Sequence, residues 1–379
     1  HPYKPVLAQE TGIMRQERPD GYSKRTETEM MELLEKKYGY AFAGAGAGAV
    51  QWIWNVNYFM NNANESSIGA KRADGSEKPE IKVTENFSRF MADVGPLMVE
   101  RQPDRIAVVF PFSNDGSNRR YSLRSTTKAA QVLAYYVRLP FYALSEYHLD
   151  ALPDLRPGLV IVPSPYIFDD DAFENLLRYV SDSGSTVLWT GPLAYGKHYE
   201  FLNRGEGIFG EIERASLSRI ELVNINGKEY QIPFDVETRA GIMLNSVARS
   251  SEKMHIAGCG RGRFIWSELP LELGENTPAV AEAYGTAAEI AGIDREIMLL
   301  SDDTAGVYCR VMRYRDNDLY ILVSEMSKDM NVLFEDKLRK LRFELVLESN
   351  RVAMFMTDAS GKVIASYRDK PVTVAWTDG

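Results

Sequence analysis

The segment Ala41–Asn55, AFAGAGAGAVQWIWN, decides how about the first hundred residues are interpreted. Glycines and alanines alternate from Gly44 to Gly48, and two tryptophans, Trp52 and Trp54, follow them. Such a pattern fits three structures: a loop that binds a nucleotide phosphate, a flexible linker, or a strand that is packed unusually close to its neighbours. The sequence on either side of the glycines separates these alternatives.

A dinucleotide-binding loop needs a strand before its glycines and a helix after them. Here residues 26–38 predict a helix, which Thr26 or Thr28 caps and Gly39 ends, and the residues VQWIW after the glycines favour a strand. A linker would be polar and rich in serine. We therefore predict a strand over residues 40–54, whose small residues allow the close packing found inside a parallel barrel.

The neighbouring segments predict alternating strands and helices. Residues 5–8 predict a short apolar strand that ends at Gln9 and Glu10, and residues 80–100 predict a second helix. The order strand, helix, strand, helix is typical of parallel βα units. Because such barrels carry functional groups at the C-terminal ends of their strands, Glu10 and the tryptophans are expected to share one cleft.

The remaining sequence predicts two further regions after a turn at residues 102–104. Strands and helices alternate from residue 105 to 191, which predicts a doubly wound α/β domain of flavodoxin-like character. Mixed elements follow, with a helix near residues 279–291. From Asp294 onward, short strands with regular turns predict a small β-sandwich. The expected domains are 1–102, 103–292 and 293–379, and the fold class is α/β.

Composition limits the classes of function. The chain has 379 residues, a formal net charge of −9 and no stripe of lysine and arginine, which argues against a nucleic-acid partner. Cys259 and Cys309 form no CxxC pair, and the four histidines form no metal-binding pattern. The apolar runs are shorter than the roughly 20 residues of a membrane helix. We expect no metal, cofactor or membrane partner, and the cellular compartment stays undecided.

Two strand ends match a known pattern. The segments VLAQETG (6–12) and AVQWIWN (49–55) resemble strands seven and eight of the barrel in retaining glycoside hydrolases of clan A, above all the family 42 β-galactosidases. The loop NESSIGAKRADGSEKPE (64–80) is similar to the passage after strand eight. The segments GRGRFIWSELPLELGEN (260–276) and YGTAAEIAGI (284–293) look like the end of that family's flavodoxin-like trimerisation domain.

The resemblance implies a chemistry and a set of site residues. A retaining glycosidase uses two carboxyl groups about 5–5.5 Å apart, of which one attacks the anomeric carbon. By motif, Glu10 would be this nucleophile in a bacterial enzyme acting on a β-linked sugar such as a β-galactoside. The expected substrate-binding residues are Gln9, Trp52, Trp54, Asn55, Glu65 and Arg72. The resemblance also implies a homo-oligomer, such as a trimer.

Simpler interpretations of these residues stay open. Trp52 and Trp54 share one face of a strand, so core packing competes with stacking on a sugar, for which Trp52 is the better candidate. For Asn55, the start of a loop competes with a hydrogen bond to a sugar hydroxyl. Glu65, Arg72 and Asp74 can form ion pairs that hold the loop in shape. The segment SNDGSNRR (113–120) lacks a glycine-rich phosphate loop, and we expect it to be structural.

The residues that are expected to belong to the barrel are too few to form all eight of its strands. A complete barrel needs roughly 250 residues, and only residues 1–102 are expected to belong to it. The chain begins HPYKPVLAQETG without a methionine, which fits a fragment, a cleavage product or a split gene. We expect the missing strands, with the acid/base carboxyl, to come from an N-terminal segment or a second polypeptide. The alternative is a non-catalytic assembly or carbohydrate-binding module.

Overall fold

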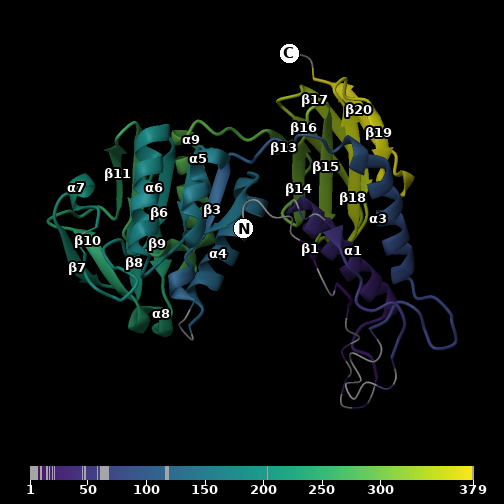
Figure 1. Ribbon diagram of the computed structural model, residues 1–379, viewed down its shortest axis with the longest axis horizontal. Coiled ribbons are helices and arrows are strands. Elements are labelled where there is room, and N and C mark those ends of the chain that lie inside the picture. The colour runs from purple at the N-terminus through teal and green to yellow at the C-terminus, as the bar shows by residue number, and fades with distance from the viewer. Residues whose placement is uncertain are drawn as a thin grey trace. The chain divides into compact units, whose positions relative to one another are not determined.

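The computed structural model describes residues 7–8, 11–13, 16, 18, 20, 22–44, 46, 48–57, 59, 68–115, 119–202 and 204–377. These residues form two compact units. Unit 1 is Pro103–Arg295. Unit 2 combines the described residues from Leu7 to Gln102 with those from Glu296 onward. Figure 1 shows both units as ribbons, and each is described by itself.

Unit 1 is built on a six-stranded sheet (Figure 1). The strand order is β11-β12-β6-β5-β3-β4, and every neighbouring pair is parallel except β11–β12. The bounds are β3 Ile106–Phe110, β4 Tyr142–Ser145, β5 Leu159–Val162, β6 Thr186–Thr190, β11 Met254–Cys259 and β12 Gly262–Ser267. All four residues of β5 are buried, as expected for a parallel strand that is covered on both faces.

Helices cover both faces of this sheet. Helix α4 (Tyr121–Gln131), its π-helical continuation Val132–Val137 and α9 (Thr277–Ile290) pack on one face, and α6 (Asp170–Ser183) packs on the other. The Asp169 side chain caps α6 by accepting a hydrogen bond from the Ala172 N–H at 3.1 Å. The 3-10 segment Glu146–Ala151 and α5 (Leu152–Leu155) follow β4.

Smaller elements complete unit 1. The hairpin β8–β9 (Ile220–Ile225 and Lys228–Pro233) contributes buried side chains to the core under α4 and α9. A second antiparallel pair joins β7 (Ile212–Ser216) to β10 (Met243–Val247), and α7 (Glu206–Phe209) and α8 (Val236–Gly241) are short helices.

The C-terminal part of unit 2 consists of two antiparallel four-stranded sheets, β13-β16-β17-β20 and β14-β15-β18-β19. Aromatic residues from both sheets share one core, in which the Tyr320 and Phe343 ring centroids are 4.7 Å apart. The bounds are β13 Ile297–Leu299, β14 Val307–Arg313, β15 Asn317–Ser324, β16 Met330–Asp336, β17 Leu341–Leu347, β18 Val352–Asp358, β19 Val363–Ser366 and β20 Thr373–Trp376. The consecutive strands β17 and β18 belong to different sheets.

The N-terminal part of unit 2 contains α1 (Glu27–Ala43), α3 (Glu80–Val94) with a 3-10 turn at Gly95–Leu97, and the parallel pair β1 (Leu7–Ala8) and β2 (Gly48–Ala49). Thr26 caps α1 in a capping box with Glu29: each residue's backbone N–H donates to the other's side chain. Helix α1 packs against β15 and β18 of the C-terminal sheet.

The structure corrects the expected strand over residues 40–54 and the helix end at Gly39. Helix α1 continues to Ala43, and the strand is limited to Gly48–Ala49. A Cβ atom at Gly39 would lie 2.7 Å from Val352 Cγ2 and 3.1 Å from Val323 Cγ2. Gly39 therefore lets the helix approach the sheet closely, and Gly44 forms the actual end of α1. The second helix also stops earlier than expected, at Val94.

Candidate functional site

The candidate site is built on the strand pair β1–β2 of unit 2. The strands pair in parallel with Ala8 opposite Ala49. Beyond them, the Val50 N–H donates to the Ala8 carbonyl at 2.8 Å, and the Thr11 N–H donates to the Val50 carbonyl at 3.0 Å. The two segments therefore remain side by side at their C-terminal ends, where parallel α/β folds place functional groups.

Gly12 brings the two strand ends into close contact. A Cβ atom at this position would lie 1.9 Å from the Trp52 carbonyl oxygen and 2.8 Å from Ile68 Cγ1. A larger residue would displace the backbone of the second segment, because only glycine leaves this space free. The glycine after Thr11 is thus a packing requirement of the junction.

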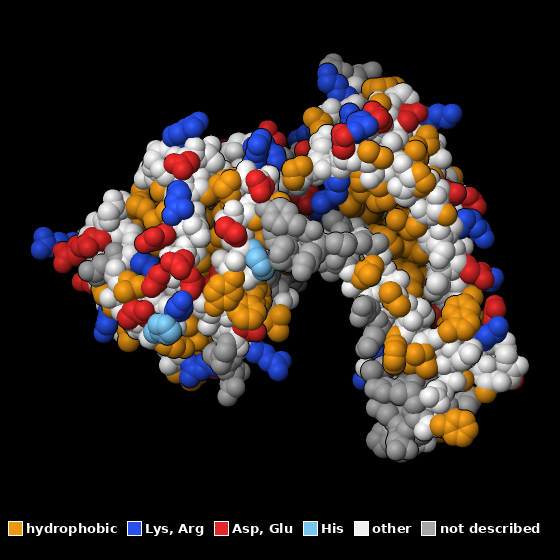
Figure 2. All heavy atoms as spheres, in the orientation of Figure 1, with side chains coloured by type: hydrophobic (Ala, Val, Ile, Leu, Met, Phe, Trp, Pro, Cys, Tyr) orange, Lys and Arg blue, Asp and Glu red, His pale blue; other side chains and the backbone are white. Residues whose placement is uncertain are grey.

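The two tryptophans lie at the surface. Trp52 is 42% exposed and Trp54 is 49% exposed, so neither is a core residue of the described structure. Asn55 is also exposed. Figure 2 shows orange, apolar side chains over the part of unit 2 that contains α1 and α3 in Figure 1. Exposed aromatic side chains in one segment are typical of a binding surface. The exposed apolar residues nearby in sequence are Leu7, Val50 and Phe59.

Arg72 lies in a segment that runs beside the tryptophans. The Lys71 N–H donates to the Trp54 carbonyl at 2.8 Å. The Arg72 guanidinium forms an ion pair with Glu27 and donates to the Ser76 hydroxyl at 3.1 Å. These contacts join the loop to the start of α1, and the residue before Arg72, Lys71, pairs with Trp54 and Asn55.

Three of the expected site residues, Gln9, Glu10 and Glu65, lie outside the described residues. For Gln9 and Glu10, the flanking residues Ala8 and Thr11 are described, and both bond to Val50. The expected role of each of the three stays a prediction.

The structure adds residues that the sequence analysis did not select. The Lys37 ammonium donates to the Gly12 carbonyl at 3.1 Å, and the Tyr38 hydroxyl donates to Gln51 Oε1 at 3.3 Å. Helical periodicity could place Leu34 and Tyr38 on one buried face of α1. It could not identify the partners of Lys37 and Tyr38, because these lie in other segments.

Glu80 is a further titratable group of unit 2. It is buried at the start of α3, and burial raises the pKa of its carboxyl above the ordinary range, with Glu27 adding a smaller increase. Among the described residues, its Oε2 atom has no hydrogen-bond partner.

The carboxyl edge of the sheet in unit 1 carries a second group of buried charges. The Ser113 N–H donates to Glu146 Oε1 at 2.7 Å. Burial is the main cause that raises the pKa of Glu146 to about 7, and the Ser113 hydrogen bonds oppose it. Nearby, Asp169 pairs with Lys197 at 2.7 Å. Open α/β sheets bind ligands at this edge.

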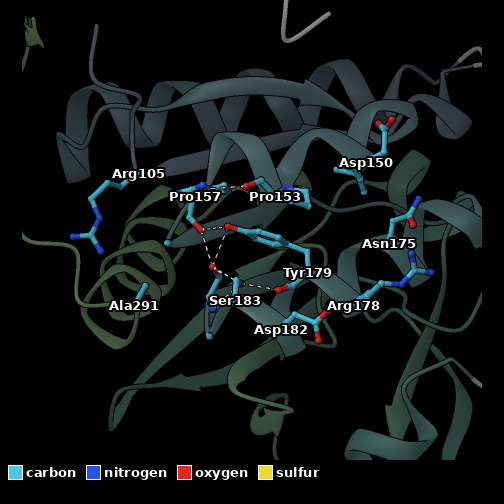
Figure 3. Close-up of a pocket in the computed structure, with 15 residues that line it drawn as sticks. Arg105, Asp150, Pro153, Pro157, Asn175, Arg178, Tyr179, Asp182, Ser183 and Ala291 are labelled. Atoms are coloured by element: carbon cyan, nitrogen blue, oxygen red, sulfur yellow. Dashed lines mark hydrogen bonds between the residues drawn. The ribbon is translucent and has the colours of Figure 1, made fainter. Parts of the chain in front are cut away.

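A pocket of about 700 Å³ lies at the opposite edge of the same sheet, near the amino ends of β3, β5 and β6. Figure 3 shows that Arg105 and Arg178 lie on opposite sides of it and do not converge on one point. The Pro157 carbonyl accepts hydrogen bonds from the Tyr179 and Ser185 hydroxyls at 2.7 and 2.8 Å. The polar groups at its centre thus bind one another.

Within the described residues, no group of three or more His, Cys, Asp or Glu side chains is arranged to hold a metal ion. No helix in the described part of the chain has the length and apolar character needed to cross a membrane. Neither Cys259 nor Cys309 forms a disulfide bond.

No protein-family model matches the chain, and no curated protein matches it in sequence. Solved structures do match it. A family 42 β-galactosidase from G. stearothermophilus has a TM-score of 0.67 and 11% identity, covering 93% of this chain and 54% of its own. The β-galactosidase from Rahnella sp. R3 has a TM-score of 0.64 and 13% identity, covering 94% and 55%. That from Halorubrum lacusprofundi has a TM-score of 0.63 and 13% identity, covering 94% and 53%.

These matches confirm the expected resemblance to family 42 enzymes at the level of the fold. The chain is a mixed α/β structure that shares its fold with part of a β-galactosidase. It spans about half the length of the solved structures that it matches.

Proposed function

We propose that this chain carries part of the active site of a retaining glycoside hydrolase that acts on a β-linked sugar, most closely a β-galactoside. The observation that carries the proposal is the junction of β1 and β2. There, the Thr11 N–H of the QETG segment (9–12) donates a hydrogen bond to the carbonyl of Val50, which lies two residues before the exposed Trp52. The likeness of the fold to β-galactosidases supports the same interpretation.

The proposed roles follow the residue types. Glu10 supplies the nucleophilic carboxylate, which forms a covalent bond to the anomeric carbon and is later released by water. Trp52 provides an apolar face for the sugar ring, and its exposure of 42% leaves that face available. Gln9, Asn55 and Glu65 bind hydroxyl groups, Trp54 extends the aromatic surface, and Arg72 holds the adjoining loop through Glu27.

The arrangement of the strands supports a matching assignment of three domains. We assign β1 and β2 to the end of a (β/α)8 barrel (1–102). The order β4-β3-β5-β6-β12 in unit 1 matches the flavodoxin-like order 2-1-3-4-5, which supports a flavodoxin-like domain over 103–292. The two facing antiparallel sheets support a β-sandwich over 293–379.

A barrel also requires strands on both sides of the β1–β2 pair, because eight strands close the sheet. The matched β-galactosidases are about twice as long as this chain. We therefore propose that a preceding segment or a second polypeptide supplies the remaining strands and the acid/base carboxyl. Assembly into a homo-oligomer, such as a trimer, belongs to the same proposal.

The test is hydrolysis of an aryl β-galactoside by the complete protein carrying Glu10→Gln. Loss of the nucleophile is expected to reduce kcat by at least about a thousandfold, since no covalent intermediate can form. Glu85→Gln, which changes an exposed carboxyl on α3, is the matched control. Unchanged turnover in Glu10→Gln would remove Glu10 from its role, whereas sugar binding without turnover in the unaltered protein would indicate a binding module.

A further inference from the structure

Helix α1 contacts each described segment of the candidate site. Lys37 donates to the carbonyl of Gly12, which follows Thr11 at the end of the first strand segment. Tyr38 donates to Gln51, the residue before Trp52. Glu27 pairs with Arg72. Three segments that are separated in the sequence are therefore fixed to one helix.

The same helix is fixed to the C-terminal sheet by a buried carboxylate. Glu35 is fully buried, and its Oε2 atom accepts a hydrogen bond from Arg351 Nε at 2.9 Å. Its Oε1 atom accepts from the Val352 N–H at 3.0 Å. A buried carboxylate with both oxygens bonded fixes the position and rotation of the helix, since any displacement leaves a charge without its partner.

Two further contacts support this attachment. The Lys36 ammonium and the Tyr40 hydroxyl each donate to Glu325 at 2.7 Å. Gly39 lies between these residues and allows close contact with Val352 and Val323. The sheet-facing side of α1 is thus held by charge, hydrogen bonds and shape together.

We propose that Lys37 and Glu35 are positioning residues, through which the C-terminal sheet determines where the two strand ends of the candidate site lie. Glu35 fixes α1 on the sheet, and Lys37 holds the backbone at Gly12 in a matching position. That the supported site binds a sugar rests on the proposed function, whereas the mechanical support of the strand ends does not.

The first test is amide hydrogen exchange of the chain carrying Lys37→Met. Loss of the charge-assisted hydrogen bond to Gly12 is expected to increase exchange in residues 50–54 by roughly tenfold. Lys82→Met, which removes an exposed lysine on α3, should leave this segment unchanged, and Lys37→Arg should restore most of the protection. Equal exchange in Lys37→Met and the unaltered chain would overturn the proposal.

The second test asks whether the sheet acts through the helix. The double variant Lys36→Met/Tyr40→Phe removes two contacts with Glu325 but none with the site. We expect exchange to increase in residues 50–54 as well as in α1. An increase confined to α1 would overturn the proposal that the position of α1 determines that of the strand ends. The variant retains the buried Glu35–Arg351 ion pair, so we expect it to fold.

The third test uses methyl β-D-galactopyranoside as the probe, with the complete protein. Lys37→Met is expected to weaken binding by roughly tenfold at an unchanged midpoint of thermal unfolding, and Lys37→Arg to restore it. Unweakened binding in Lys37→Met would contradict the positioning role. If the unaltered protein does not bind the sugar, the proposed function fails, and the exchange experiments alone decide whether Lys37 and Glu35 position the strand ends.

Discussion

The strand ends of unit 1 and unit 2 differ in what covers them. At the carboxyl edge of unit 1, Asn114 Oδ1 accepts hydrogen bonds from the backbone N–H groups of Tyr166 and Ile167 at 3.3 and 3.0 Å. The loops after two neighbouring strands are therefore closed onto each other. In unit 2, the segment after β2 instead exposes Trp52 and Trp54.

The buried carboxylates of the two units also differ in the groups that they bind. In unit 1, Glu272 is fully enclosed and accepts hydrogen bonds from the hydroxyls of Ser164, Thr190 and Tyr284 at 2.5–2.7 Å. This carboxyl binds only groups of its own domain. In unit 2, Glu35 fixes a helix that holds the exposed segment. Within the described residues, the loops at the edge where this fold type usually binds ligands bond to each other, whereas unit 2 exposes aromatic side chains, and this difference favours the candidate site in unit 2.

The largest effect is expected from breaking the support of unit 2. Arg351→Ala removes the closer of the two guanidinium groups that pair with the buried Glu35 carboxylate and leaves only Arg368, 3.6 Å away, so we expect a loss of about 3 kcal/mol in the free energy of unfolding. Arg342→Ala is the matched control, because its partner Glu335 lies 3.6 Å away and the side chain is 46% exposed. It should cost less than about 1 kcal/mol. Equal losses in urea unfolding would show that Glu35 does not depend on Arg351.

The next effect concerns unit 1 and depends on pH. Burial raises the pKa of Glu146 to about 7 in the folded state, whereas an unfolded glutamate titrates near 4.3. Its contribution to stability is therefore complete below about pH 4.3 and is lost as the pH rises through about 7. Between these values, the unaltered chain should lose up to about 3 kcal/mol relative to Glu146→Gln.

Urea unfolding of both proteins at several pH values measures this difference. Glu174→Gln, which changes an exposed carboxyl on α6, serves as the control and should follow the pH dependence of the unaltered chain. If the Glu146→Gln and unaltered curves stay parallel between pH 4 and 7, the buried carboxyl of unit 1 is not protonated in the folded state.

Local signals predicted much of the structure. Continuous apolar runs such as Leu159–Val162 mark the buried parallel strands, and the acidic start and Gly184 end of α6 match its observed bounds. The sequence also predicts a turn at Asp316–Asp318 between two strands, and the structure has antiparallel β14 and β15 joined there, with the connection at residues 314–316. In each case, the residues that specify the element lie within the element or beside it.

The incorrect predictions involve partners far away in the sequence. Gly39 was interpreted as a helix stop, but its small size serves contact with Val352. The Glu35–Arg351 pair joins residues that no local pattern relates. For the candidate site, residue types and motifs indicated Trp52, Trp54, Asn55 and Arg72, but the supporting contact of Lys37 with Gly12 required the fold.

The smallest effect is expected at the junction itself. Gly12→Ala places a methyl group against the Trp52 carbonyl, and because the obstacle is backbone, we expect a cost of about 1–3 kcal/mol and a displaced strand end. Gly285→Ala is the matched control: its surroundings are open and it lies inside helix α9, where alanine is favoured, so it should be neutral or slightly stabilising. Thermal unfolding and tryptophan fluorescence of both variants distinguish these outcomes. If Gly12→Ala behaves like Gly285→Ala, the two strand ends do not touch as described, and the contrast between the joined loops of unit 1 and the tightly packed, exposed strand ends of unit 2 no longer holds.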